Sequence, residues 1–317
     1  FGVGQLSSLI TYGFMMLMSL MMLSFVFAMI IIAEEGARRI CEVLLATSTI
    51  NSPENPLTEV ADGSIDFDNV GFSYSGPEGR EALSDVNLHI KSGEVIGIIG
   101  GTGSAKSTLV QLIPRLYDVI AGSVSVGGHN VKDYDIDVLR GAVAMVLQKN
   151  VLFSGTIKEN LLWGNPDATD EEILEAARLA QADSFVQTFP DKYETHIEQG
   201  GNNVSGGQKQ RLCIARALLR RPKVLILDDS TSAVDTKTDS LIRAGLKDYL
   251  PDTTKIIIAQ RTSSIEESDK IIVLDNGRIN AIGTHEELLK DNPIYREVYF
   301  SQNKQSVDEN QSQEGEV

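Results

Sequence analysis

The sequence has 317 residues, of which 28 are Lys or Arg and 44 are Asp or Glu, so its formal net charge is -16. An acidic excess of this size argues against nucleic acid as the main partner, because binding to phosphate backbones needs clustered Lys and Arg. The two cysteines, Cys41 and Cys213, are too few for a disulfide framework or a four-thiolate zinc site, so we expect reduced thiols. A nucleotide stays compatible with these numbers, since it needs only one local site.

The first 33 residues contain no charged residue. The 25-residue run Leu9–Ala33 would exceed the bilayer core of about 30 Å as a helix, at about 1.5 Å per residue. A signal peptide and a buried core helix are the alternatives, but the run is too long for either and no basic residue precedes it. Arg38 and Arg39 follow, so the positive-inside tendency places everything after residue 34 in the cytoplasm. We expect residues 1–50 to be a membrane-spanning helix with a cytoplasmic extension.

This apolar segment also carries small residues and six of the chain's seven methionines. Small residues let helix backbones approach in lipid, so further membrane helices are expected. Since the chain opens at Phe1 without an initiator Met, we expect it to be the C-terminal part of a longer multi-pass protein of the cell membrane. The methionines are either lipid-facing filler or a pliable lining for apolar or amphipathic substrates.

Changes of composition divide the rest of the chain. Turn signals at Asn51-Ser52-Pro53 and Asn55-Pro56 predict a polar linker over residues 51–63. A domain is expected over residues 64–300, with a helical subdomain at about 149–216. Residues 301–317 are polar and acidic without any aromatic residue, which predicts a disordered tail.

A glycine-rich turn lies between a short apolar run, Val95–Ile99, and a helical pattern. Such a turn points backbone N–H groups and a helix N-terminus at a polyphosphate, with Lys106 at the β- and γ-phosphates and Ser107 holding Mg²⁺. The consensus has Gly where this chain has Ala105; a methyl there is tolerable if φ is negative, so we expect binding with altered geometry. The predicted contacts to ATP are Gly100, Gly101, Thr102, Gly103, Ser104, Ala105, Lys106, Ser107 and Thr108.

A second buried strand, Val224–Leu227, ends in two acidic residues. Asp228 is placed to support Mg²⁺ through water, and Asp229 stands where a residue orienting the attacking water would lie. By itself this pattern is weak, because any buried strand followed by an acidic turn resembles it.

The segment Val204-Ser205-Gly206-Gly207-Gln208 removes that ambiguity. It resembles the signature of the ATP-binding cassette (ABC) transporter family, usually LSGGQ. The resemblance covers residues 64–300, and the preceding helix and linker resemble the end of an exporter's membrane domain. It implies an α/β fold, namely a P-loop NTPase ABC cassette with a RecA-like core, an antiparallel β subdomain and a helical signature subdomain, preceded by one transmembrane helix.

The resemblance also assigns roles to residues. Tyr74 would stack on adenine, and Gln148 would reach Mg²⁺ and the attacking water. Other residues would face the ATP held by a partner subunit, namely Ser205, Gly206, Gly207 and Gln208 of the signature and Asp235 of the D-loop Ser232-Ala233-Val234-Asp235.

Two residues depart from the family pattern where catalysis is expected. Asp229 replaces the usual Glu, which withdraws the carboxylate by roughly 1.5 Å, and a misplacement near 1 Å can cost about 100-fold in rate. Gln260 replaces the switch His and cannot carry a positive charge. Together with Ala105, these two substitutions resemble the pattern of heterodimeric ABC exporters in which one of the two nucleotide sites is degenerate. We therefore expect slow ATP hydrolysis at the site of this chain. We also expect its signature to complete a competent site in a partner that carries Glu and His at the two positions.

The leading interpretation is therefore an ATPase subunit of a heterodimeric multidrug-type exporter that uses ATP and Mg²⁺. A homodimeric lipid or peptide exporter with two slow sites is the alternative within the class. Two further alternatives belong to other functional classes. One is a regulatory ABC module that transports nothing, and the other is a channel gated by a degenerate nucleotide site. The transported substrate cannot be read from this chain.

Overall fold

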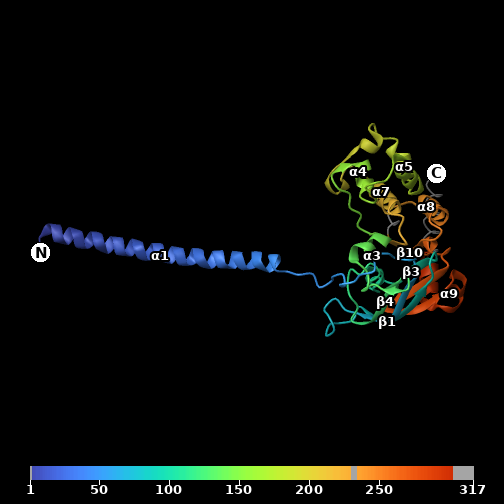
Figure 1. Ribbon diagram of the computed structural model, residues 1–317, viewed down its shortest axis with the longest axis horizontal. Coiled ribbons are helices and arrows are strands. Elements are labelled where there is room, and N and C mark those ends of the chain that lie inside the picture. The colour runs from blue at the N-terminus through green and yellow to red at the C-terminus, as the bar shows by residue number, and fades with distance from the viewer. Residues whose placement is uncertain (1, 230–233, 303–317) are drawn as a thin grey trace, which may run out of the picture. The chain divides into compact units, whose positions relative to one another are not determined.

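The structure is a computed structural model that describes residues 2–229 and 234–302. The chain divides into two compact units, residues 1–51 and residues 52–317. Each unit is described separately below, with the elements labelled as in Figure 1.

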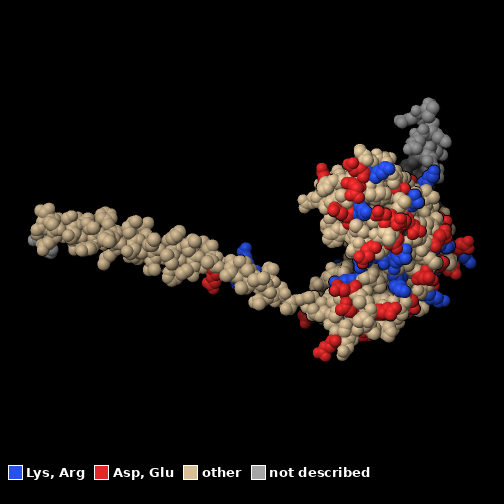
Figure 2. All heavy atoms as spheres, turned by 45° about the horizontal axis from the view of Figure 1, so that its top comes forward, with Lys and Arg blue, Asp and Glu red and all other residues tan. Residues whose placement is uncertain are grey.

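The first unit consists of one long helix, α1 (Val3–Leu44), which has no buried residue. Among the described residues, α1 is the helix that is long and apolar enough to cross a bilayer. The hydroxyls of Ser8, Thr11, Ser19 and Ser24 donate hydrogen bonds to the carbonyl four residues before them, so these polar groups are satisfied within the helix. Charged atoms appear only toward its C-terminal end (Figure 2), where Arg38 pairs with Glu35 at 2.8 Å.

The centre of the second unit is a six-stranded sheet in the order β12-β11-β3-β10-β9-β6. β11, β3, β10, β9 and β6 are parallel, and β12 joins β11 as an antiparallel edge. The strands are β3 (Val95–Ile99), β6 (Val143–Val146), β9 (Val224–Asp228), β10 (Thr254–Ile258), β11 (Lys270–Asp275) and β12 (Arg278–Gly283).

β9 shows how this sheet separates two hydrophobic cores. Because side chains alternate along a strand, Val224 and Ile226 enter one core, and Leu225 and Leu227 enter the other. The first core also contains α2 (Lys106–Gln111), α3 (Ile136–Ala142) and an antiparallel sheet of order β2-β1-β4-β5, formed by β1 (Ile65–Phe72), β2 (Leu83–Ile90), β4 (Ala121–Val126) and β5 (His129–Asn130).

The second core lies between the central sheet and the helical part of the unit. Figure 1 shows α4, α5 and α7 grouped together on one side of β3 and β10. This part contains α4 (Ile157–Leu162), α5 (Asp170–Leu179), α6 (Asp183–Val186), α7 (Gly206–Leu219), the short pair β7 (Gly155–Thr156) and β8 (His196–Ile197), and the 3-10 turns η1 (Lys192–Glu194) and η2 (Gln199–Gly201). α8 (Thr236–Tyr249), the 3-10 turn η3 (Thr262–Ser264) and α9 (His285–Asp291) complete the unit.

Side-chain capping explains why α4 and α5 in the helical part start where they do. Thr156 and Thr169 each form a reciprocal capping box with the Glu three residues later, at the starts of α4 and α5. The first turn of α5 is acidic, which complements the helix dipole.

The segments expected to be a linker and a tail both make tertiary contacts that the sequence did not predict. In the 51–63 segment, the Ser52 hydroxyl accepts from Ile136 N and donates to Asp135, and Leu57 pairs with Tyr134, so this segment is attached to the start of α3. Residues 293–302 are helical, so the segment predicted to be a disordered tail begins within this helix. Composition alone could not reveal the tertiary hydrogen bonds of Gln302 that are described below. The rest of the predicted tail lies outside the described residues.

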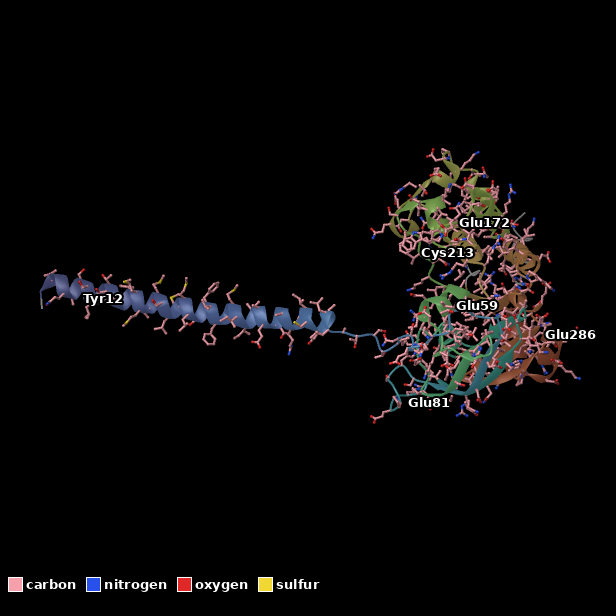
Figure 3. All side chains as sticks on the ribbon, in the orientation of Figure 1. Tyr12, Glu59, Glu81, Glu172, Cys213 and Glu286 are labelled. Atoms are coloured by element: carbon pink, nitrogen blue, oxygen red, sulfur yellow. The ribbon has the colours of Figure 1, made fainter. Side chains whose placement is uncertain are left out.

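Both cysteines are free thiols. Cys41 is exposed on α1, and Cys213 is buried on α7 within the helical part (Figure 3). Burial raises the pKa of the Cys213 thiol.

Candidate nucleotide site

Four adjacent strands of the central sheet deliver the predicted site residues to one edge. β3, β10, β9 and β6 are neighbours and parallel, so their carboxyl ends lie together. The loop starting at Gly100 follows β3, and Gln260 follows β10. Asp228 is the last residue of β9 and Asp229 follows it, while Gln148 follows β6. The carboxyl edge of a parallel sheet is where ligands bind in this class of fold.

The loop between β3 and α2 is compact and closed by its own lysine. Lys106 Nζ donates to the carbonyl oxygens of Gly100 at 2.8 Å and Gly101 at 2.9 Å. A side chain at Gly100 would meet the Leu274 carbonyl oxygen at 2.2 Å, so only glycine fits there. Burial lowers the pKa of Lys106, while the carboxylates of Asp228 and Asp229 act in the opposite direction.

Ala105 has a positive φ, whereas a negative φ was expected for this residue. Its φ is +72° and its ψ is 26°, so it lies in the left-handed region that favours glycine, as the N-cap of α2. This conformation costs an alanine about 1 kcal/mol or more. The residue also packs against the core beneath the loop, which offsets part of that cost. The expectation of a negative φ is therefore wrong, because the turn into α2 fixes the backbone regardless of the side chain.

Asp229 is the centre of a hydrogen-bonded cluster. Its Oδ2 atom accepts from Gln260 Nε2 at 2.6 Å and from Gln148 Nε2 at 3.0 Å. Its backbone N–H donates to the Ile258 carbonyl at 2.9 Å, which fixes it against the end of β10. The structure therefore brings together all three residues expected to be catalytic.

The electrostatics of this cluster favour a proton on the carboxyl group more than usual. Burial and the adjacent Asp228 raise the pKa of Asp229, while the hydrogen bonds from Gln260 and Gln148 and the charge of Lys106 act in the opposite sense. Asp229 is 9% exposed and Asp228 7% exposed, so both carboxylates are largely removed from water.

Tyr74 lies beside the start of α2. Its hydroxyl is 3.0 Å from Thr108 Oγ1, and its ring makes edge contacts with Phe72 and Tyr117. Tyr74 is nevertheless 56% exposed, so its ring presents a flat apolar surface next to α2.

The signature residues form the start of a different helix. Ser205 is the N-cap of α7: its Oγ accepts from Gln208 N at 3.3 Å, and its own N–H donates to Gln208 Oε1 at 2.9 Å. Gly206 and Gly207 follow in the first turn, so their amides belong to a helix N-terminus. This helix lies in the helical part, apart from the cluster around Asp229.

Asp235 caps α8, where its Oδ1 accepts from Thr238 N at 2.9 Å. This hydrogen bond lowers the pKa of Asp235. The D-loop residues Ser232 and Ala233 lie outside the described residues.

The residues predicted to hold Mg²⁺ have suitable chemistry. The Ser107 hydroxyl, the carbonyl oxygen of the Gln148 side chain and the Asp228 carboxylate all offer hard oxygen atoms, which Mg²⁺ prefers, and protein Mg²⁺ sites typically add phosphate oxygens and water. Ser107 is exposed in the first turn of α2, and Asp228 ends β9 at the same edge of the sheet.

Comparison with known proteins assigns a family to part of the chain. Residues 83–232, which run from β2 through the phosphate loop and signature, match the family described as ABC transporter. This matched region belongs to the ABC transporter family. The second unit of the chain has the ABC cassette fold, and α1 precedes that cassette.

The cassette is similar to bacterial relatives. The chain is 46% identical over 245 residues to a candidate multidrug export ATP-binding/permease protein of Staphylococcus aureus strain NCTC 8325, covering 77% of this chain and 42% of that protein. The corresponding protein of the bovine strain RF122 is 45% identical over the same length, with the same coverage. The chain thus spans less than half the length of these relatives.

A solved structure, that of a bacterial Atm1-family ABC exporter with ATP bound, is also similar. It aligns with a TM-score of 0.80 and 33% identity, and the alignment covers 84% of this chain and 46% of the exporter chain. This likeness supports the α/β cassette fold expected from the sequence.

The sequence did not reveal two contributors to the site. Tyr117 is a ring neighbour of Tyr74, at 5.1 Å between centroids. Gln302 donates a hydrogen bond to the backbone carbonyl of Gln260, although the sequence assigned Gln302 to the tail. Neither residue belongs to a recognisable motif, and only the folded chain brings them to the cassette edge.

Proposed function

We propose that this chain is the ATP-binding subunit of an ABC exporter in the cell membrane, with its cassette in the cytoplasm. It couples ATP binding and hydrolysis to efflux of an apolar or amphipathic substrate. The observation that carries this proposal is the convergence of the phosphate loop, Asp228, Asp229, Gln148 and Gln260 at one edge of the sheet. The names of the Staphylococcus aureus relatives and the apolar helix α1 support export across a membrane.

Within its own site, the chain supplies groups that bind and orient ATP. Lys106 would exchange its bonds to the loop carbonyls for phosphate oxygens, and the amides that begin α2 face the same ligand. Ser107, Gln148 and Asp228 would hold Mg²⁺, which supplies charge stabilisation for the phosphates when bound. Tyr74 would offer its exposed ring to adenine.

We propose that this site hydrolyses ATP slowly. Both amides donate to the single Oδ2 atom of Asp229, and its short side chain keeps the carboxylate close to β9. Gln260 is neutral, so it cannot add the positive charge that a protonated His would bring near the γ-phosphate.

The signature helix is proposed to serve a different site. Ser205, Gly206 and Gly207 form a complete, capped helix N-terminus that can bind a γ-phosphate. The proposed partner is a second half-transporter that carries Glu and His at the positions corresponding to Asp229 and Gln260. The two chains would form a heterodimer with one slow and one competent site.

Photolabelling with radioactive 8-azido-ATP tests nucleotide binding by this chain within the assembled transporter. Lys106→Ala should reduce labelling of this subunit by about 10- to 100-fold, because a charge-assisted hydrogen bond contributes about 1.5–3 kcal/mol. Lys290→Ala, which removes an exposed lysine from α9, is the matched control and should label normally. Equal labelling of the Lys106→Ala and wild-type subunits would contradict the proposed site.

A further inference from the structure

The last described helical turns of the chain are firmly attached to the cassette. In residues 293–302, Tyr295 is fully buried and is hydrogen-bonded through its hydroxyl to His285 Nδ1 at 2.7 Å. Its N–H donates to Asn292 Oδ1 at 2.8 Å, and Asn292 Nδ2 in turn donates to Asn280 Oδ1 at 2.7 Å. The helix is therefore fixed to β12 and α9 before it reaches its last turn.

From that last turn, the carboxamide of Gln302 pairs with the backbone that follows β10. Gln302 Nε2 donates to the Gln260 carbonyl oxygen at 2.6 Å, and Gln302 Oε1 accepts from the Thr262 N–H at 2.9 Å. Oε1 also lies within hydrogen-bonding distance of Thr262 Oγ1, at 3.2 Å. The planar Gln302 amide thus forms hydrogen bonds with the Gln260 carbonyl and with the Thr262 N–H two residues later, as a neighbouring parallel strand would.

We infer that Gln302 is a positioning residue for the switch segment, residues 260–262. The backbone of Gln260 bonds to Gln302, and its side chain bonds to Asp229 at 2.6 Å. Holding the backbone at residues 260 and 262 limits the directions in which the Gln260 side chain can point. The C-terminal helix is in this way connected to the carboxylate at the centre of the nucleotide site.

The hydrogen bonds of Gln302 restrain the switch segment more than they restrain the C-terminal helix. Tyr295 and Asn292 already attach the helix through buried hydrogen bonds. Residues 260 and 262 instead lie outside β10, whose last residue is Ile258. Without Gln302, the Gln260 carbonyl and the buried Thr262 N–H would lose these bonds, and the segment could relax away from Asp229.

This inference rests on the proposed function, because it assumes that ATP occupies the site. In the proposed site, the γ-phosphate of ATP would face Gln260 and Asp229, and ADP lacks that phosphate. Loss of the Gln302 contact is therefore expected to weaken ATP binding and leave ADP binding unchanged.

Competition photolabelling of this subunit in the assembled transporter measures both affinities. 8-Azido-ATP labelling is competed with ATP in one series and with ADP in another. Gln302→Ala should weaken competition by ATP about three- to tenfold, as expected for the loss of one or two hydrogen bonds, with ADP competition unchanged. Gln302→Glu should be at least as weak toward ATP, because its carboxylate can accept from Thr262 but cannot donate to the Gln260 carbonyl.

Glu297→Ala removes a long exposed side chain from the same helix and should match the wild type. An unchanged ratio of ATP to ADP affinity in Gln302→Ala would overturn the inference. So would a parallel loss of ATP and ADP affinity together with a lowered thermal unfolding midpoint, since that result describes a purely structural contact. If the wild-type subunit takes no label and Lys106→Ala is indistinguishable from it, the proposed function itself fails, and the inference fails with it.

Discussion

The side-chain amide of Gln260 donates a 2.6 Å hydrogen bond to the Oδ2 atom of Asp229. The Gln148 amide donates to the same oxygen at 3.0 Å. Both are neutral donors, so this arrangement differs from one in which a longer carboxylate meets a histidine that can take up a proton. The two departures from the family pattern are thus in direct contact, and their effects on hydrolysis should be coupled.

Restoring the longer carboxylate should accelerate this site only in part. Asp229→Glu extends the side chain by one methylene, roughly 1.5 Å, and should raise single-turnover ADP formation by about tenfold. The double variant Asp229→Glu with Gln260→His should raise it further, to about 100-fold, because the charge at the switch position is also restored. The measurement is made with the partner's proposed catalytic Glu replaced by Gln. Full recovery from Asp229→Glu alone would show that the change from His to Gln is silent.

Ala105 permits a comparison of backbone strain with side-chain bulk. Ala105→Gly should change the free energy of unfolding by less than about 1 kcal/mol, because relief of the left-handed strain is offset by the lost methyl contact and a more flexible unfolded chain.

Ala105→Val puts a β-branched residue at φ +72°, so it should lower the thermal unfolding midpoint and impair 8-azido-ATP labelling. Differential scanning fluorimetry of the purified transporter tests both variants. A valine variant as stable as the wild type would mean that the loop does not require the left-handed conformation.

Asn160 should be critical for stability in the helical part. It is 2% exposed, accepts from Phe153 N at 2.8 Å, and donates to the carbonyls of Phe153 at 2.9 Å and Thr156 at 3.0 Å. Asn160→Ala leaves these backbone groups without their partner and should cost about 3 kcal/mol, or about 6–12 °C in the unfolding midpoint. Asn202→Ala, at an exposed position, should change the midpoint by less than about 2 °C. Equal midpoints for the two variants would refute this role.

Local sequence signals predicted the fold of the cassette and several of its elements. The run Val95–Ile99 forms β3 and leads into the phosphate loop, and Ser205 caps α7 as the signature pattern suggests. Other features depend on contacts between distant segments. The positive φ of Ala105 and the pairing of Gln302 with residues 260 and 262 arise from the tertiary arrangement, so composition and motif spacing did not predict them.

The central claim is that this cassette contributes more to the site of its partner than to hydrolysis at its own, and one comparison tests it most directly. Substrate-stimulated ATP turnover of the assembled transporter is measured for Ser205→Ala and for Asp229→Asn. Thr169→Ala controls for loss of a helix cap, since it removes the equivalent capping box of α5. We predict that Ser205→Ala lowers turnover by at least about tenfold, and that Asp229→Asn and Thr169→Ala each lower it by less than about twofold. Loss of turnover in Asp229→Asn with near-normal turnover in Ser205→Ala would contradict the account.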